Sequence, residues 1–64
     1  MILTVYDYTQ GMGNIIMQDD DYNKADAIFW KDGILVTIEG KTYEIFEIKI
    51  SAYVTSMDIA VRLN

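Results

Sequence analysis

The 64 residues of the chain allow one domain, residues 1–64, and contain no proline-rich or serine-rich stretch that could serve as a linker. Apolar residues make up 52% and charged residues 23% of the chain, a balance that excludes intrinsic disorder. Cysteine and histidine are absent, which excludes disulfides, thiolate or imidazole metal sites, and the usual general base near neutral pH. The sequence therefore predicts a protein that is not an enzyme and uses no cofactor and no metal.

The length of the chain also bears on association. A domain of this size buries only about 60% of its unfolded surface, and such domains are usually stabilised further by disulfides, a metal or a second subunit. The first two are disfavoured without cysteine or histidine, whereas ten isoleucines and eight aromatic residues supply apolar surface. We therefore expect a homo-oligomer, a dimer first.

Ten acidic residues against five basic ones give a formal charge of −5. This charge repels phosphate backbones, so we expect no direct nucleic-acid binding, and it attracts proteins with a basic surface. No apolar run approaches the ~18 residues of a membrane span, so we expect no membrane association. Residues 1–6 lack the basic region and cleavage site of a secretory signal. The expected location is cytoplasmic.

Alternation of apolar and polar residues predicts an all-β domain. The predicted strands cover residues 2–8, 14–18, 25–30, 34–38, 42–50 and 57–63. Because Asp32 and Gly33, and then Glu39 and Gly40, are typical of two-residue turns, residues 25–50 are expected to form a three-stranded antiparallel meander. The whole chain is then a small antiparallel meander of five or six strands. It would form a curved sheet or partly open barrel of the size of an SH3 or OB domain.

The longest predicted strand changes phase along its length. Tyr43 and Ile45 share one face, whereas the apolar residues from Phe46 to Ile50 follow the opposite alternation. A one-residue slip between Ile45 and Phe46 predicts a β-bulge, or a bend that carries the strand across two sheets. Residues 51–56 contain no glycine or proline, so a gradual bend or one continuous strand is expected there.

The segment before Trp30 has two interpretations. Asp19, Asp20 and Asp21 favour a loop, but an aspartate cap before apolar residues at helical spacing also allows a short helix within residues 20–29. The three carboxylates do not have the spacing of a calcium loop, which needs glycine at its sixth position where this chain has lysine. We expect a solvated loop without a metal.

Aromatic residues are the candidates for contact with another protein, because Trp and Tyr dominate interface hot spots. On a strand, Phe29 and Trp30 would point to opposite faces, and so small a domain can hardly bury large side chains on both faces. In this prediction the carboxylates take the place of phosphates on the partner's surface, and the aromatic side chains anchor the contact. The predicted partner-binding residues are Asp19, Asp20, Asp21, Tyr22, Asp26 and Trp30.

Two functions follow from these expectations. The first is a non-enzymatic protein-interaction module; in size and acidity the chain is similar to small phage-encoded inhibitors, which implies a target among host nucleic-acid-handling or defence proteins. The alternative is a small structural or assembly subunit of a virion or larger complex, whose exposed strands pair edge to edge. A third function, an enzyme based on carboxylates alone, is disfavoured because the domain has little volume for a substrate cleft.

Overall fold

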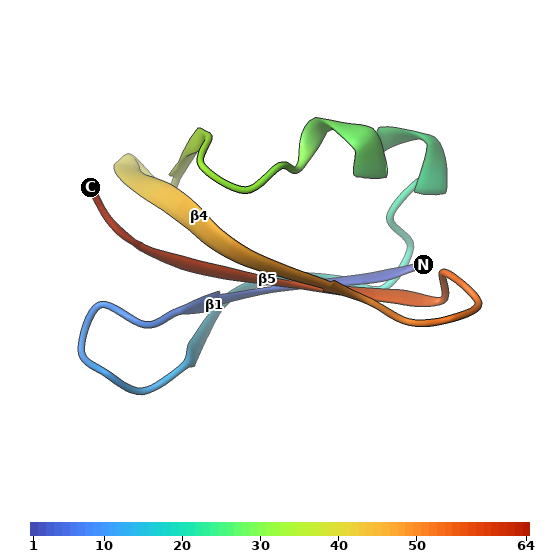
Figure 1. Cartoon of the computed structure of the whole chain (residues 1–64), viewed down its shortest axis with the longest axis horizontal. Coiled ribbons are helices and arrows are strands. Elements are labelled where there is room, and N and C mark those ends of the chain that lie inside the picture. Colours follow the sequence, from blue (N-terminus) through green and yellow to red (C-terminus); the bar gives the residue numbers. More distant parts are fainter.

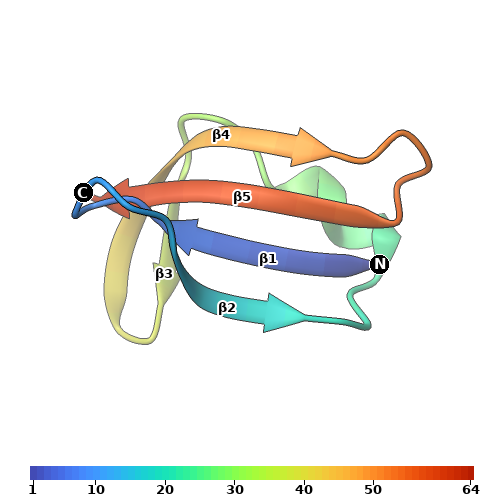
Figure 2. The same ribbon diagram turned by 90° about the horizontal axis from the view of Figure 1, so that it is seen from below.

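The computed structural model describes all residues, 1–64, and arranges them as one five-stranded sheet with a single short helix (Figures 1 and 2). The strands are β1 (Ile2–Asp7), β2 (Asn14–Asp19), β3 (Leu35–Ile38), β4 (Lys41–Ile50) and β5 (Ser56–Leu63). They lie in the order β2-β1-β5-β4-β3, and the sheet curls into a half-barrel. The predicted all-β class with a curved, partly open sheet is confirmed.

One pair of strands departs from the antiparallel meander. β1 and β5, which lie side by side in the middle of the sheet in Figure 2, run parallel, with Ile2 opposite Ser56 and Asp7 opposite Val61. The other three pairs are antiparallel. Alternation predicts where a strand lies but not its partner, because pairing between the two ends of a chain has no local signal.

The core lies on the face of the sheet that the helix covers (Figure 1). Along β5, Met57 and Ile59 point into it while Asp58 and Arg62 face solvent, as the alternation predicts. The residues that form the core are at most 5% exposed: Leu3, Val5, Tyr43, Ile45, Met57, Ile59 and Val61.

The phase change in β4 is a β-bulge, as predicted. The register with β5 skips Phe46, because Ile45 and Glu47 face consecutive residues of β5. One extra residue restores the alternation, so that Tyr43, Ile45 and Ile48 all pack on the core side. The strand therefore stays within one sheet and gains a bend.

Residues 25–30 do not form the predicted strand. Most of them belong to the 3₁₀ helix η1 (Lys24–Phe29), so the strand is wrong and the alternative of a short helix within residues 20–29 is confirmed. The cap is Asn23 rather than an aspartate, and its side chain accepts the amide N–H of Ala25 at 3.0 Å. η1 is the only helix, and with six residues it is far too short to cross a membrane.

Only the second of the two predicted hairpins exists. Glu39 and Gly40, with φ of 50° and 80°, form the two-residue turn between β3 and β4, as a type I′ turn requires. The hairpin predicted at Asp32 and Gly33 is wrong because its first arm is helical. Gly33, with φ of 89°, instead turns the chain from η1 into β3, and its amide N–H donates to the carbonyl of Ile45 at 2.8 Å.

Residues 51–55 make a tight turn without glycine or proline. The Ser51 hydroxyl accepts the amide N–H groups of Thr55 at 2.9 Å and Ser56 at 3.2 Å, and Val54 adopts a φ of 54°. These side-chain hydrogen bonds replace the usual turn residues. The gradual bend or continuous strand predicted for residues 51–56 is therefore wrong.

Gly40→Ala is expected to lower the free energy of unfolding by about 1–2 kcal/mol. The site has open space for a methyl group, so the cost comes from the backbone φ of 80° alone. Urea unfolding followed by circular dichroism measures the loss. Glu39→Gly is the control and is not expected to destabilise the turn, because glycine adopts a φ of 50° readily. Equal stability of Gly40→Ala and the wild type would contradict the turn assignment.

Candidate functional site

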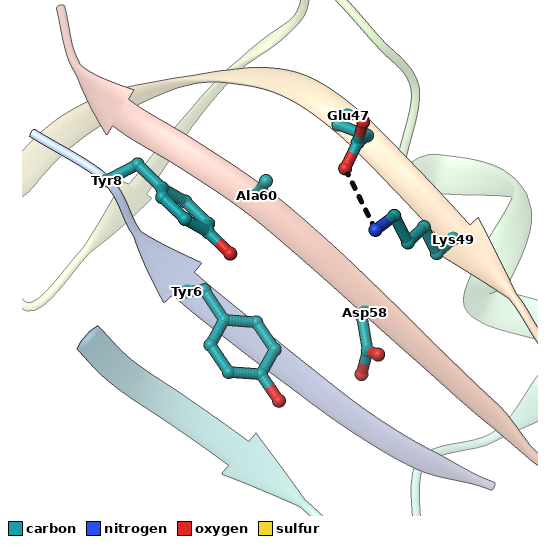
Figure 3. Close-up of a pocket in the computed structure, with 6 residues that line it drawn as sticks. All are labelled: Tyr6, Tyr8, Glu47, Lys49, Asp58 and Ala60. Carbon is teal, nitrogen blue, oxygen red and sulfur yellow. Dashed lines mark ion pairs between the residues drawn. The ribbon is translucent and has the colours of Figure 1, made fainter. Parts of the chain in front are cut away.

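The face of the sheet opposite the core is uncovered, and it carries the one pocket of the structure (Figure 3). The volume of this pocket is about 310 Å³. Its walls come from β1, β4 and β5 and from the residue that follows β1. The lining residues are Tyr6, Tyr8, Glu47, Lys49, Asp58 and Ala60.

Strand register explains why these side chains meet. Ala60 lies between Tyr6 on β1 and Glu47 on β4, and Asp58 lies opposite Lys49 in the next row of the same face. Side chains that are directly opposite on neighbouring strands are within contact distance. Because the side chain of Ala60 is small, it leaves a hollow between larger neighbours, as Figure 3 shows.

The ring of Tyr8 is held by neighbouring groups. It meets Phe46 edge-on, with ring centroids 5.7 Å apart and planes at 77°. The guanidinium of Arg62 lies 5.2 Å from the centre of the Phe46 ring. Gly13 also lies against Tyr8, since a Cβ at that position would be 2.7 Å from the Tyr8 Cζ. These contacts place the Tyr8 ring along one wall of the pocket.

Gly13→Ala should displace the Tyr8 ring with a stability loss below about 1 kcal/mol. The new methyl group would overlap the outer end of the Tyr8 ring, and because Tyr8 is 41% exposed, its side chain can shift toward solvent. NMR signals of the Tyr8 ring and the Ala60 amide would report the displacement.

Gly11→Ala is the control for this prediction. A Cβ at Gly11 meets nothing, but φ is 86° and the Gly11 amide N–H donates to the Tyr8 carbonyl at 2.9 Å, so this variant should lose about 1–2 kcal/mol with a smaller change in the Tyr8 ring signals than Gly13→Ala causes. Unchanged Tyr8 signals in Gly13→Ala would contradict the close contact.

Two carboxylates and one ammonium group border the pocket. The Lys49 Nζ lies 3.5 Å from the Glu47 Oε1, and both side chains are more than half exposed, so this ion pair is weak. The only other ion pair joins Arg62 to Glu44, which leaves Asp58 without one. The pocket therefore has a net charge of −1 and one unpaired carboxylate.

The predicted acidic residues fall in two places. Asp19 ends β2, and Asp20 and Asp21 follow it; all three are exposed, and we call residues 19–21 the acidic turn. The Asp19 Oδ1 accepts the amide N–H of Asp21 at 2.9 Å, which fixes the shape of this turn. Asp26 is also exposed, but it belongs to η1 on the core side of the sheet.

Register relates the acidic turn to one residue of the pocket, Asp58. Gln18 and Asp58 face Thr4 from the two sides of β1, so Asp58 is level with the residue before Asp19. Two strand spacings, about 10 Å, separate β2 from β5. The acidic turn and Asp58 therefore lie at the same end of the sheet, although Asp19, opposite the core residue Leu3, belongs to the core side.

Tyr22 and Trp30 lie on the core side of the sheet. Both are half-buried and pack against the core. The Trp30 Nε1 donates to the Tyr22 hydroxyl at 2.8 Å, and the backbones of Tyr22 and Met1 exchange two hydrogen bonds of 2.9 Å. These hydrogen bonds hold η1 and Met1 against the core. The partner-binding role of the two aromatic residues stays a prediction beside this structural one.

Sequence reasoning did not single out Tyr6, Tyr8 or Ala60 as site residues. The alternation places Tyr6 and Tyr8 on one face of the first strand. That signal does not show which face remains uncovered or that β5 supplies the alanine between them. The missing information was the parallel pairing of β1 with β5.

The pocket lining offers two phenol hydroxyls, two carboxylates and one ammonium group around an alanine floor. No group of three or more carboxylates lies close enough together to hold a metal ion. The lining can donate and accept hydrogen bonds and can attract a cation. Comparisons of the chain with protein-family models, curated proteins and solved structures found no match.

Proposed function

We propose that the protein is a non-enzymatic interaction module, a small acidic homo-oligomer that binds a second protein with a basic surface. The observation that supports this most is the number of large hydrophobic side chains that are exposed to solvent. Nine of 64 residues are buried, whereas twelve large hydrophobic residues are exposed, up to 86% for Tyr53. Exposed apolar surface on so small a domain is typical of contact with another protein.

Charge supports a basic partner. The acidic turn and the unpaired Asp58 lie at the same end of the sheet, and the chain carries a net charge of −5. Such a surface attracts basic partners and repels nucleic acid. A groove that binds nucleic acid is itself basic, so an inhibitor of phage type that occupies such a groove on a host nucleic-acid-handling or defence protein is the form of this function we favour.

Affinity capture with two charge-matched variants tests this proposal. Asp20→Asn with Asp21→Asn removes two charges of the acidic turn and spares the Asp19 carboxylate that shapes it. Asp32→Asn with Glu39→Gln removes two exposed charges in the turns on either side of β3. We expect a partner that the wild type and the second variant retain and the first variant loses. Capture that survives Asp20→Asn with Asp21→Asn would contradict the phosphate-mimic mechanism.

A structural or assembly subunit is the second candidate, because the edge strand β3 favours it. Its four residues carry no charge and pair with β4 in unbroken register, whereas β2, the other edge, is interrupted at Ile16. Charges and bulges keep edge strands from pairing with other chains, and β3 has neither. Rings or filaments in size-exclusion chromatography would favour this candidate, and a closed dimer would favour the interaction module.

A further inference from the structure

The pocket on the uncovered face has room for one extended side chain. Its volume of about 310 Å³ is at the lower end of the range for ligand pockets, about 300–1,000 Å³. In Figure 3 the rings of Tyr6 and Tyr8 stand beside each other at one side of Ala60, and Asp58 lies beyond them on β5. A long side chain that lay over Ala60 would contact both rings and end near the Asp58 carboxylate.

The lining favours a cation over a neutral or negative group. Glu47 pairs with Lys49 at 3.5 Å, and Asp58, opposite Lys49, has no ion pair, so the lining keeps a net charge of −1. Tyrosine rings also attract cations that lie over their faces within about 6 Å. Both contributions act in the same direction on a group placed between the rings and Asp58.

The same face already holds one guanidinium between an aromatic ring and a carboxylate. Arg62 lies 5.2 Å from the centre of the Phe46 ring, and its Nε and Nη2 donate to the Glu44 Oε1 at 3.2 and 3.1 Å. Ala60 and Asp58 alternate with core residues along the same strand, so they face the same side as Arg62. A planar guanidinium suits this combination of groups better than an ammonium does, because it stacks on rings and binds a carboxylate through two N–H groups.

We propose that the pocket binds the side chain of an arginine from a partner protein, with the guanidinium against Tyr6 and Tyr8 and hydrogen-bonded to Asp58. The inference rests on the proposed function and deepens it, since it names the group of the basic partner that the uncovered face recognises. The acidic turn then supplies attraction at longer range, and the pocket supplies the specific contact.

An NMR titration of the isolated chain with acetyl-Gly-Arg-Gly-amide tests the proposal. We expect saturable shifts confined to the pocket, at the amides of Tyr6, Asp58 and Ala60. The peptide with citrulline in place of arginine has nearly the same shape without the charge and should cause no saturable shift. The lysine peptide should bind more weakly than the arginine peptide.

Two variants locate the contact. Asp58→Asn should weaken binding of the arginine peptide about fivefold, the effect of losing one exposed charge pair, whereas Asp32→Asn removes the same charge from an exposed turn and should leave the affinity unchanged. Tyr8→Leu should also weaken binding, because it removes one aromatic wall. Asp58 is exposed, and a native-like spectrum confirms that its variant folds.

Three outcomes would overturn the inference: an equal response to citrulline, shifts centred on the acidic turn in place of the pocket, or unchanged affinity in Asp58→Asn. The titration needs no natural partner, so its failure is distinguishable from failure of the proposed function. Partner capture that depends on Asp20 and Asp21 without peptide binding in the pocket would retain the interaction module and remove the arginine site.

Discussion

Ile59→Ala is expected to unfold most of the protein at room temperature. Ile59 is fully buried in β5, the strand between β1 and β4. Truncation of a buried isoleucine to alanine costs about 2–5 kcal/mol, and the core of a domain this small rarely supplies more than about 3–5 kcal/mol. The expected cost of the substitution is therefore about as large as the free energy of unfolding of the whole domain. Far-UV circular dichroism and urea unfolding measure the effect.

Ile28→Ala is the matched control for this substitution. Ile28 is 69% exposed in η1, so the same change should alter the free energy of unfolding by no more than about 0.5 kcal/mol. A native-like urea midpoint for Ile59→Ala would contradict the placement of β5 at the centre of the core.

Trp30→Ala is expected to lower the free energy of unfolding by about 2–4 kcal/mol. Trp30 packs against the core and donates a hydrogen bond to the Tyr22 hydroxyl, so its removal uncovers the core and frees η1. Trp30→Phe keeps an aromatic ring but loses this hydrogen bond and part of the packed area, so it should cost about 1–2 kcal/mol. Urea unfolding of the two variants measures how much stability the remaining ring retains.

Phe29 provides the comparison for Trp30 because it is its neighbour in sequence. Phe29 is 67% exposed, and Phe29→Ala should change stability by no more than about 0.5 kcal/mol. If Trp30→Ala were as stable as Phe29→Ala and reduced only partner binding, Trp30 would be an exposed anchor and its structural role would be wrong.

The alternation of apolar and polar residues predicted those strands that have one face against the core and the other in solvent. In residues 57–63, Ile59 faces the core and Arg62 faces solvent, and this contrast is visible in the sequence. The bulge was also predictable, because one extra residue at Phe46 shifts the pattern by a single position. Local pattern suffices where each residue's surroundings depend on its own strand.

The pattern was insufficient for the segment from Ala25 to Trp30. Its bulky residues, Ile28, Phe29 and Trp30, favour a strand by composition. The helix depends instead on the Asn23 cap and on the hydrogen bond between Trp30 and Tyr22, and the second of these is a tertiary contact. The hairpin at Gly33 was wrong for the same reason, since its turn residues were correct but its first arm was not a strand.

The candidate site divides in a similar way. The exposure of the acidic turn followed from its composition, because three consecutive carboxylates remain in solvent. The pocket required β5 to lie beside β1, which places Ala60 next to Tyr6 although 54 positions separate them. Asp58 therefore became a candidate binding residue only through the sheet order.

Sedimentation velocity of the purified chain, from low micromolar to near-millimolar concentration, tests most directly whether the uncovered apolar surface serves association. We predict a sedimentation coefficient that rises with concentration toward that of a dimer or larger closed assembly. A chain that sediments as a monomer at every concentration, with Phe29 and Tyr53 fully accessible to a soluble quencher or modifying reagent, would contradict this prediction.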